Sequence, residues 1–290
     1  MIAISGGRGF IGSALVQVFS ADTPLISIYR GSGIQENGNI LEVGHSHPDL
    51  KALLKPITIF IHTAGQIRGN PDQLYETNVG SVEFFANILP TSLQQVIHFS
   101  SVNVFFAEAN PYGFSKKMSE AAWQRSRFAN RLTILRPSWV YGPGDGKNTY
   151  PLIHKIERWP LLPLPTTPLQ PVYIRDLVEL VRVLTRQQAL QPQTLVVSGR
   201  EQTDFCQIAR LLAQYLRRRL LVIPLPAPLL QAMSSATRLI GLKKPAQRLY
   251  GLQIPKTWHT AEIWDLLPRE TTPLQVGLQQ TVIQYQNSLQ

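Results

Sequence analysis

The stretch IAISGGRGFIG, residues 2–12, stands at the start of the chain and leads into a segment with helical apolar spacing, residues 13–19. A buried strand, a glycine turn and a helix N-terminus in this order present free backbone N–H groups and the positive end of a helix dipole to a pyrophosphate. Gly6 permits the turn, Gly9 lets the backbone approach the phosphates, and Gly12 lets the helix pack closely on the strand. The spacing is the GxxGxxG variant of the dinucleotide-binding pattern. The other residues of this predicted dinucleotide site are Phe10 and Ile11.

The length and composition of the chain predict one large domain or a main domain with a smaller lobe. The chain has 290 residues, of which 44% are hydrophobic, and this is enough for a substantial core. Because the first predicted strand begins at residue 2, no room is left for a cleavable signal peptide, and we expect a cytoplasmic protein. Prolines interrupt the longest apolar runs, as in residues 220–230, so we expect no membrane insertion.

Cysteine and histidine usage gives no indication of a metal site. The single cysteine, Cys206, has no partner for an internal disulfide and no companion cysteines for a structural zinc site. The six histidines lack metal-ligand spacing supported by nearby carboxylates. We therefore predict no metal.

The charge balance is strongly basic. Lys and Arg together number 28 against 18 Asp and Glu, which gives a net charge of +10, and the densest clusters are Arg217–Arg219 and Lys243–Lys244. Such a chain attracts polyanions. No helix-turn-helix, zinc-finger or RNA-binding signature accompanies the charge, so we expect no nucleic-acid partner and favour an anionic substrate.

Short apolar runs alternate with helix-length segments in the first half of the chain. Continuously apolar runs of this length are typical of parallel strands buried on both faces. After the first strand, the predicted strands cover residues 25–29, 57–61, 96–99 and 132–135. Helix-length segments, among them residues 79–89 and 115–128, lie between them. This rhythm predicts an α/β fold of the Rossmann type, with a doubly wound parallel sheet.

The carboxyl ends of these predicted strands carry polar residues or glycine turns. Ligands bind at this edge of an open parallel sheet, so we expect the residues there to line a single crevice. They are residues 6–12, Arg30, residues 62–65, residues 100–101 and residues 136–137.

Beyond Tyr141 the sequence becomes rich in proline and glycine, which indicates loops and a change of architecture. We assign residues 1–142 to a Rossmann domain and residues 143–290 mainly to a smaller C-terminal substrate lobe. Residues 172–184 are expected to return to the main sheet.

A tyrosine and a lysine four residues apart form the candidate acid/base pair. Tyr112 and Lys116 stand at the start of a predicted helix and therefore share one face. A free tyrosine has a pKa of about 10, and the adjacent cation is expected to lower the pKa of Tyr112. Ser101, after the strand at 96–99, is placed to hydrogen-bond the reacting oxygen. We predict Ser101, Tyr112 and Lys116 as the catalytic residues.

The order of the glycine fingerprint, the strand ending in Ser100-Ser101 and the YGFSK segment at 112–116 resembles the extended short-chain dehydrogenase/reductase family. Within that family, the resemblance is to the nucleotide-sugar epimerase/dehydratase group, including UDP-sugar 4-epimerases and 4-ketoreductases. The most specific match is LRPSWVYGPG, residues 135–144, which is similar to the family's RPxxVYGPG segment. IHTAG at 61–65 looks like the segment along the cofactor, and Asn78 resembles the asparagine of the following helix start.

The resemblance implies a cofactor site and a substrate site on named residues. Cofactor-binding residues are expected at the glycine turn, at Arg30 and at His62, Thr63, Ala64, Gly65, Asn78, Ser100, Lys116 and Pro137. Substrate-binding residues are expected at Ser101, Asn103, Arg136, Trp139 and Arg175.

Three departures from the family pattern bear on this assignment. Arg30 stands where an acidic residue would accept hydrogen bonds from the ribose of NAD, and a guanidinium suits the 2′-phosphate of NADP, to which Arg8 adds a second positive contact. We therefore favour NADP, with NAD as the alternative. No acidic residue that contacts the adenine is recognisable in residues 38–49. Phe105-Phe106 replaces the usual tyrosine-glycine and is expected to reshape the substrate wall.

These features predict an NADPH-dependent 4-ketoreductase that acts on a nucleotide-diphosphate sugar, with Tyr112 as acid/base. An NAD-dependent nucleotide-sugar 4-epimerase is the first alternative, and a non-catalytic NADP-binding sensor or scaffold is the second. A dehydratase is disfavoured because Val102-Asn103 stands where that branch carries acidic residues. The apolar faces of the segments at 79–89 and 115–128 serve either a homodimer interface or the internal core.

Overall fold

A computed structural model describes residues 1–186, 191–242 and 249–289. The chain divides into two compact units, each made of two chain segments. The first unit comprises residues 1–137 and 177–196, and the second comprises residues 138–176 and 197–290. Lys243–Lys244, one of the two basic clusters in the sequence, lies outside the described residues.

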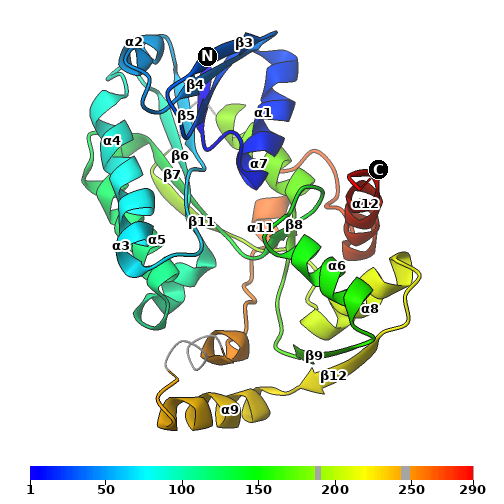
Figure 1. The fold of residues 1–290 in the computed structure, drawn as a ribbon. Coiled ribbons are helices and arrows are strands. Elements are labelled where there is room, and N and C mark those ends of the chain that lie inside the picture. Colours follow the sequence, from blue (N-terminus) through cyan, green and yellow to red (C-terminus); the bar gives the residue numbers. More distant parts are fainter. Residues whose placement is uncertain (187–190, 243–248, 290) are drawn as a thin grey trace. The chain divides into compact units, whose positions relative to one another are not determined.

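The first unit is built on an eight-stranded sheet with the strand order β11-β7-β6-β5-β1-β2-β4-β3 (Figure 1). Strands β1, β2, β4, β5, β6 and β7 pair in parallel, and β3 pairs with β4 in the antiparallel direction. The bounds are β1 (Ile2–Ser5), β2 (Leu25–Tyr29), β3 (Ile34–Asn37), β4 (Ile40–Gly44), β5 (Ile59–His62), β6 (Gln95–Phe99), β7 (Leu132–Pro137) and β11 (Gln193–Val197). The predicted Rossmann-like α/β fold is confirmed.

Helices cover both faces of this sheet. In Figure 1, α4 and α5 lie on one face, and α1 and α7 lie on the other. The bounds are α1 (Phe10–Asp22), α2 (Leu50–Leu53), α3 (Pro71–Tyr75), α4 (Ser81–Ile88), α5 (Pro111–Arg125) and α7 (Ile174–Arg186), with a π-helical turn η1 (Glu76–Gly80) and 3₁₀ segments η2 (Val102–Ala109) and η3 (Ala129–Arg131). Central strands covered on both faces must be apolar throughout, which explains why the sequence shows continuous apolar runs there.

The core of the first unit lies between the sheet and the layer containing α4 and α5. Trp123 of α5 is fully buried and its ring lies 6.2 Å from that of Phe60 on β5, which in turn packs 4.9 Å from Phe85 of α4. Large aromatic side chains bury much apolar area, and this burial fixes α5 on the sheet. The helix that carries the predicted acid/base pair is therefore held rigidly on its strands.

The second unit contains two short parallel strand pairs and several helices. Strand β8 (Val140–Tyr141) pairs with β10 (Val172–Tyr173), and β9 (Leu161–Pro165) pairs with β12 (Leu221–Leu225). Its helices include α6 (Thr149–Arg158), α8 (Phe205–Tyr215), α9 (Ala227–Leu239), α11 (Ala261–Trp264) and α12 (Leu274–Asn287), and residues 249–253 are also helical. Helix α8 packs on β9, β12, α6 and α12.

Residues 172–184, predicted to return to the main sheet, divide between the two units. Strand β10 pairs with β8 in the second unit, and residues 177–184 of α7 belong to the first unit, which contains the main sheet. The apolar residues of α7 recur with the helical period, which places Leu177, Val181 and Leu184 on one buried face. The strand that returns to the main sheet is β11. In the described part of the chain, no helix is both long and apolar enough to cross a membrane.

Candidate active site

The glycine turn after β1 has the geometry that the sequence predicts for a dinucleotide loop. Gly6 has a φ of +76°, and a Cβ added to it would lie 2.7 Å from the backbone nitrogen of Ala64. A Cβ on Gly12 would lie 2.1 Å from the carbonyl oxygen of Gly6, so the helix packs against the turn without room for a side chain. Both positions therefore require glycine, Gly6 for conformation and Gly12 for close packing.

The N-terminus of α1 is left open by the protein itself. Gly9 is the N-cap residue, and no side chain caps the first helical turn at Phe10 and Ile11. A Cβ on Gly9 would meet only the carbonyl oxygen of Gly6, at 3.1 Å. The uncapped amide groups and the helix dipole suit a pyrophosphate. At the end of β6, the hydroxyl of Ser100 is buried without a hydrogen-bond partner among the described residues, as expected for a group that a cofactor would satisfy.

The segment His62–Gly65 packs directly against this turn. Thr63 donates a hydrogen bond from its Oγ1 to the carbonyl oxygen of Ser5 at 2.6 Å. The His62 ring is fully buried, with Nδ1 2.6 Å from the Ser5 hydroxyl and Nε2 3.3 Å from the Ser81 hydroxyl. Burial, and secondarily the charge of Lys116, lowers the pKa of His62 to about 3. His62 is therefore a neutral core residue, and its predicted cofactor contact stays a prediction.

A second buried histidine, His98 on β6, stacks on His62 with a centroid distance of 5.3 Å. Its Nε2 lies 3.0 Å from the Ser119 hydroxyl, which itself donates to the carbonyl oxygen of Lys116 at 2.7 Å. Because Ser119 has only one proton to donate, His98 must be the donor to Ser119. His98 thus supports the turn of α5 that carries Lys116.

The predicted catalytic residues Ser101 and Tyr112 come together through the entry to α5. A side-chain hydrogen bond joins Tyr112 and Ser101. The Ser101 Oγ also accepts a hydrogen bond from the Asn103 Nδ2 at 2.9 Å, and the Asn103 Oδ1 accepts one from Asn110 at 3.2 Å. Asn110 caps α5 by accepting a hydrogen bond from the Tyr112 N–H at 3.0 Å. A continuous chain of polar contacts therefore fixes Ser101 relative to Tyr112.

The same contacts involve Asn103, which was predicted to bind substrate. Its amide nitrogen and amide oxygen are both engaged with protein side chains, Ser101 and Asn110. The contacts indicate a positioning role at the edge of the site. Asn110 was not predicted at all, although Asn directly before a Pro at a helix start is a recognisable cap signal.

The pKa of Tyr112 differs from the sequence expectation. Burial raises it to about 12, and the hydrogen bond with Ser101 acts in the opposite direction. Lys116 makes no contribution to this shift, and burial lowers the pKa of its own ammonium group to about 8. In this structure Tyr112 is a protonated phenol at neutral pH, and it is suited to donate a proton.

The Lys116 ammonium group lies near the loop that follows β5. A Cβ built on Gly65 would lie 3.8 Å from the Lys116 Nζ and 3.1 Å from the Asn78 Oδ1. Asn78 is fully buried; it donates to the Ser115 Oγ at 2.8 Å and accepts a hydrogen bond from the Gln66 N–H at 2.7 Å. Asn78 therefore ties the loop after β5 to the helix next to Lys116, a positioning role that depends on its buried amide.

An ion pair that the sequence analysis did not find lies one helical turn after Lys116. Glu120 accepts two hydrogen bonds from Arg136, at 2.9 Å from Nε and 2.6 Å from the terminal nitrogen. Glu120 raises the pKa of Lys116 against the larger effect of burial. The Arg136 guanidinium also lies 5.1 Å from the ring centre of Phe105. Arg136, which was predicted to bind the substrate, is thus in contact with Glu120 and with the ring of Phe105.

At the other end of the glycine turn, three residues form a cluster on β2 and β4. Arg8 donates a hydrogen bond to Glu42 at 2.7 Å, and its guanidinium lies 3.6 Å above the ring of Tyr29. Arg8 is therefore paired with a carboxylate, and its role as a second phosphate contact stays a prediction. Arg30 directly follows β2 and is exposed. Pro137 ends β7.

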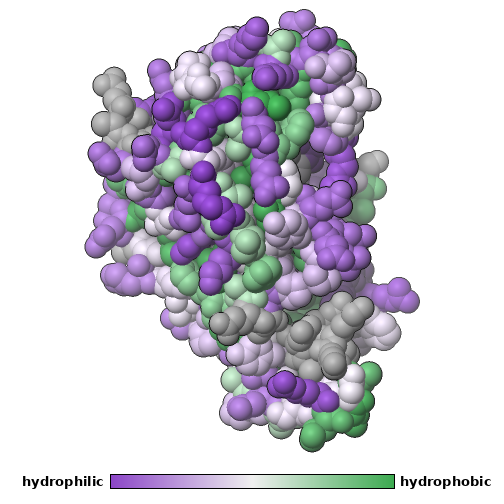
Figure 2. Space-filling model, turned by 90° about the vertical axis from the view of Figure 1, so that its left-hand side faces the viewer, coloured by the Kyte–Doolittle hydropathy of each residue, from purple (hydrophilic) through white to green (hydrophobic). Residues whose placement is uncertain are grey.

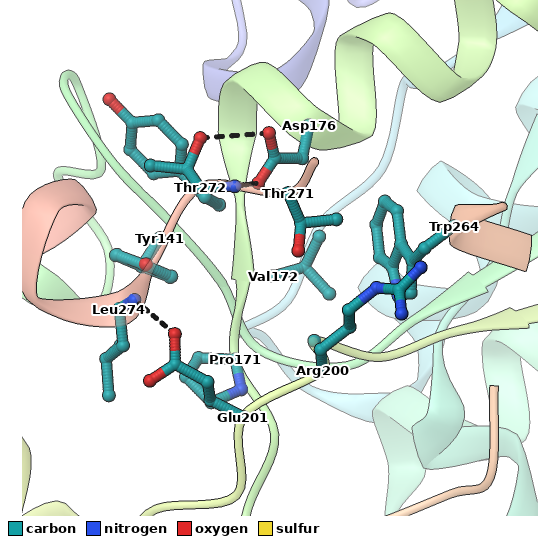
Figure 3. Close-up of a pocket in the computed structure, with 12 residues that line it drawn as sticks. Tyr141, Pro171, Val172, Asp176, Arg200, Glu201, Trp264, Thr271, Thr272 and Leu274 are labelled. Carbon is teal, nitrogen blue, oxygen red and sulfur yellow. Dashed lines mark hydrogen bonds between the residues drawn. The ribbon is translucent and has the colours of Figure 1, made fainter. Parts of the chain in front are cut away.

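The second unit carries the remaining predicted substrate residues. Trp139 stacks on Phe205 at 5.2 Å, and its indole N–H is buried without a hydrogen-bond partner among the described residues. Arg175 is exposed at the start of α7. Figure 3 shows a small pocket in this unit, which Arg200, Glu201 and Trp264 line among other residues.

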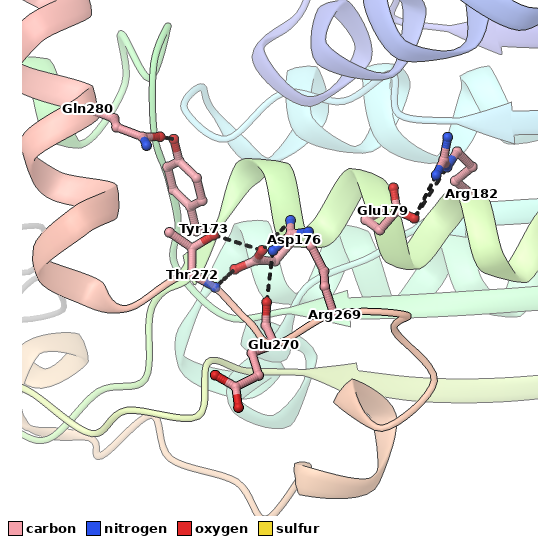
Figure 4. Close-up of polar contacts among 8 residues, drawn as sticks. All are labelled: Tyr173, Asp176, Glu179, Arg182, Arg269, Glu270, Thr272 and Gln280. Atoms are coloured by element: carbon pink, nitrogen blue, oxygen red, sulfur yellow. Dashed lines mark hydrogen bonds and ion pairs between the residues drawn. The ribbon is translucent and has the colours of Figure 1, made fainter.

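The buried carboxylate of Asp176 organises this unit around the start of α7. It accepts hydrogen bonds from Arg269 at 2.9 Å and from the Thr272 N–H and hydroxyl at 2.8 and 3.0 Å (Figure 4). Near it, the Tyr173 hydroxyl donates to Gln280 at 2.5 Å. These polar groups are satisfied by one another, which is typical of a structural network.

Comparisons with known proteins agree with this architecture. Residues 2–198 match the model of the NAD dependent epimerase/dehydratase family. The chain is 27% identical to a UDP-glucose 4-epimerase of Vibrio cholerae over 316 residues, which cover 97% of this chain and 94% of that protein. It is 26% identical to a ceramide reductase of Caulobacter vibrioides (strain NA1000 / CB15N) over 283 residues, covering 90% and 88% of the two chains. The structure of MoeE5 in complex with UDP-glucose and NAD superposes with a TM-score of 0.77 at 18% identity, covering 100% and 99% of the two chains.

Proposed function

This chain belongs to the NAD dependent epimerase/dehydratase family, and we propose that it is an NAD(P)-dependent oxidoreductase that acts on the sugar of a nucleotide-diphosphate sugar. One observation carries the proposal. The Tyr112 phenol is hydrogen-bonded to Ser101 and shares α5 with the buried Lys116. The Lys116 Nζ lies near Gly65, in the loop that packs against the glycine turn before the uncapped N-terminus of α1. A strongly perturbed phenol and ammonium beside a dinucleotide loop are the parts that hydride-transfer chemistry on a hydroxyl or ketone requires.

The residues have separate tasks in this reaction. A bound nicotinamide supplies or accepts the hydride. In the direction of reduction, Tyr112 donates its proton to the carbonyl oxygen as that oxygen gains negative charge, and Ser101 holds the same oxygen by a hydrogen bond. In the direction of oxidation, Tyr112 must first lose its proton, which requires its pKa to fall from about 12 when positive charge is added nearby. An oxidised nicotinamide would add that charge when bound, and we assign Lys116 to the ribose of the same cofactor.

The substrate class rests on the relatives and on two side chains of the second unit. The Vibrio relative is named for UDP-glucose, and MoeE5 was solved with UDP-glucose. Trp139 offers an unsatisfied indole N–H and Arg175 an exposed cation, and both groups suit a nucleotide diphosphate. We assign the nucleotide-diphosphate part of the substrate to these residues.

Two outcomes share this machinery, and different observations favour each. Reduction of a 4-keto sugar by NADPH is supported by the protonated state of Tyr112 and by Arg30, which suits the 2′-phosphate of NADP. Epimerisation at C4 with retained NAD is supported by the UDP-glucose 4-epimerase relative and by the Glu42 carboxylate, which lies beside the glycine turn and already binds Arg8.

The experiment that separates them presents the purified protein with two substrates. A UDP-linked 4-keto-6-deoxy sugar is mixed with NADPH, and with NADH in parallel, while the absorbance of the reduced nicotinamide is followed. UDP-glucose is incubated with NAD, and the sugar is analysed for UDP-galactose. Stoichiometric consumption of NADPH supports the reductase, and interconversion of the sugars without net change in the cofactor supports the epimerase. If the protein catalyses neither reaction and binds neither cofactor, this result would contradict the proposed oxidoreductase activity.

A further inference from the structure

The strand pair β9 and β12 in the second unit is apolar on both faces. Leu162 and Val222 point inward, where α8 covers them. On the other face, Leu161 and Leu221 stand side by side in the parallel register, and Leu221 is 62% exposed. Ile223, two residues further along β12, is also exposed. An outward strand face in contact with water is normally polar, so this one is unusual.

The helix that follows β12 is nearly uncovered. Leu230 is the single buried residue of α9. Leu229, Met233 and Ile240 lie at positions i, i+4 and i+11, on one stripe of the helix, and all three are exposed. The neighbouring Leu239 is 88% exposed. A helix of 13 residues gains most of its stability from packing its apolar side, so α9 presents a face that lacks a partner among the described residues.

The same part of the chain is strongly basic. Residues 205–261 contain no aspartate or glutamate and nine lysines and arginines, so this segment alone carries +9 of the net +10. Arg218 and Arg219 directly precede β12 and are exposed. Because β9 and β12 run parallel, the exposed Trp159 lies at the same end of the strand pair as these arginines. The acidic residue nearest in sequence to Trp159, Glu157, is hydrogen-bonded to Tyr285 at 2.6 Å.

Figure 2 gives a view of this region. The figure is turned about the vertical axis from Figure 1, so α9, the lowest helix in Figure 1, lies at the lower end of Figure 2. Hydrophobic atoms reach the surface there next to hydrophilic ones. The exposed residues of β9, β12 and α9, with Trp159 and the two arginines, are called the basic apolar face below.

We propose that the basic apolar face docks on an anionic phospholipid surface. Exposed leucines and isoleucines bind the boundary of the acyl chains, a tryptophan prefers the headgroup level, and arginines are attracted to anionic headgroups. All three kinds of residue occur together here, without any acidic side chain in residues 205–261 to oppose them. This is adsorption to a membrane surface from one side and requires no spanning helix. It is independent of the proposed hydride-transfer activity.

Charge decides between this occupant and a second copy of the chain. A symmetric contact between two copies would bring two acid-free basic segments against each other, and like charges at an interface oppose association. An anionic bilayer instead supplies both the opposite charge and an apolar layer. The observations therefore favour the lipid surface over self-association.

Flotation of the full-length protein with lipid vesicles tests the proposal. Vesicles of phosphatidylcholine alone are compared with vesicles of equal parts phosphatidylcholine and phosphatidylglycerol. We expect the protein to float with the mixed vesicles, to stay behind with the neutral ones, and to be released as salt is raised. The double variant Leu239→Ser/Ile240→Ser is expected to weaken binding to the mixed vesicles by at least about tenfold, because two exposed apolar side chains are removed.

Matched controls separate this docking from general stickiness. Ile283→Ser removes an exposed isoleucine of α12 in the same unit and should leave vesicle binding unchanged. Arg218→Gln/Arg219→Gln should weaken binding, whereas Lys51→Gln/Lys55→Gln, which makes the same change in net charge on the first unit, should have a much smaller effect. Thermal unfolding of each variant shows that it is folded.

Three results would overturn the proposal. One is the absence of binding to the mixed vesicles by folded protein. Another is binding that Leu239→Ser/Ile240→Ser and Ile283→Ser weaken equally. The third is a concentration-dependent dimer that the Leu239→Ser/Ile240→Ser variant abolishes while vesicle binding persists, which would assign the face to a second copy.

Discussion

Glu120 holds the guanidinium of Arg136 through two hydrogen bonds, at 2.9 and 2.6 Å, four residues after Lys116 on the same helix. The Glu120 side chain is 4% exposed and that of Arg136 is 22% exposed. This pair joins α5 to β7, and its carboxylate offsets part of the effect of burial on Lys116.

Glu120→Gln is expected to destabilise the protein by about 1–3 kcal/mol, because it leaves a partly buried guanidinium without its counter-charge. The lost carboxylate should also lower the pKa of Lys116 further below about 8. Urea unfolding measures the first effect. The pH profile of kcat/KM measures the second, in which the alkaline limb should move to lower pH.

The matched control is Glu83→Gln, which removes an exposed helical carboxylate from α4. It should leave both stability and the pH profile close to those of the unchanged protein. An unshifted alkaline limb in a folded Glu120→Gln variant would remove Glu120 from the tuning of Lys116.

Gly12→Ala is expected to disrupt the dinucleotide turn. Its Cβ would lie 2.1 Å from the carbonyl oxygen of Gly6, and backbone atoms on both sides must move to admit it. We expect a loss of stability of about 1–3 kcal/mol and a large loss of cofactor affinity. Gly80→Ala is the control, since its Cβ would meet nothing within 4 Å, and it should be neutral or slightly stabilising. Equal cofactor binding by the two variants would contradict the assignment of the turn.

Buried His62 makes the stability of the protein fall in acid. Its pKa is depressed from 6.5 to about 3 in the folded state, so the unfolded chain takes up the proton first. The stability contributed by neutral His62 is therefore complete above about pH 6.5 and is lost progressively as the pH falls toward 3. Each pH unit within this window costs about 1.4 kcal/mol per histidine.

His62→Gln is expected to flatten the dependence of unfolding free energy on pH between about pH 6 and pH 5. The measurement is urea unfolding at several pH values, with His259→Gln, an exposed histidine, as the control that keeps the original slope. A slope unchanged in His62→Gln would show that another group, for example His98, accounts for the whole acid effect.

Arg30→Ala tests the cofactor preference. If the guanidinium binds the 2′-phosphate, the variant should lose about 1.5–3 kcal/mol of affinity for NADP, roughly 10- to 100-fold, and little for NAD. Titration of cofactor fluorescence measures both constants. Arg125→Ala, an exposed cation at the end of α5, is the control. Equal losses for NADP and NAD would refute the role of Arg30 as a phosphate ligand.

Those parts of the fold and of the site that depend on short local motifs could be predicted from the sequence. The glycine turn, the strands near residues 25–29 and 132–135, and the pairing of Tyr112 with Ser101 were all predicted from short segments whose chemistry is visible in one line of sequence. Local patterns of this kind need no knowledge of distant partners.

Other features depended on contacts between distant parts of the chain. The hairpin of β3 and β4 was missed because β3 is exposed and polar, IQEN, and carries no strand period. Glu120 was missed because its partner, Arg136, lies 16 residues away on β7. The pKa of Tyr112 was predicted in the wrong direction because sequence spacing reveals a neighbouring charge but not the burial that outweighs it.

We propose that Tyr112 exchanges a proton with the substrate oxygen during hydride transfer. Tyr112→Phe keeps the ring and removes only the hydroxyl, so cofactor affinity should be nearly unchanged while turnover of the nucleotide sugar falls by about 10²–10⁴-fold. Tyr75→Phe, an exposed tyrosine of α3, should retain full activity. The direct measurement is the rate of hydride transfer under single-turnover conditions, together with the cofactor dissociation constant. We expect only the rate to fall in Tyr112→Phe, and an unchanged rate in that variant would remove Tyr112 from the proton transfer.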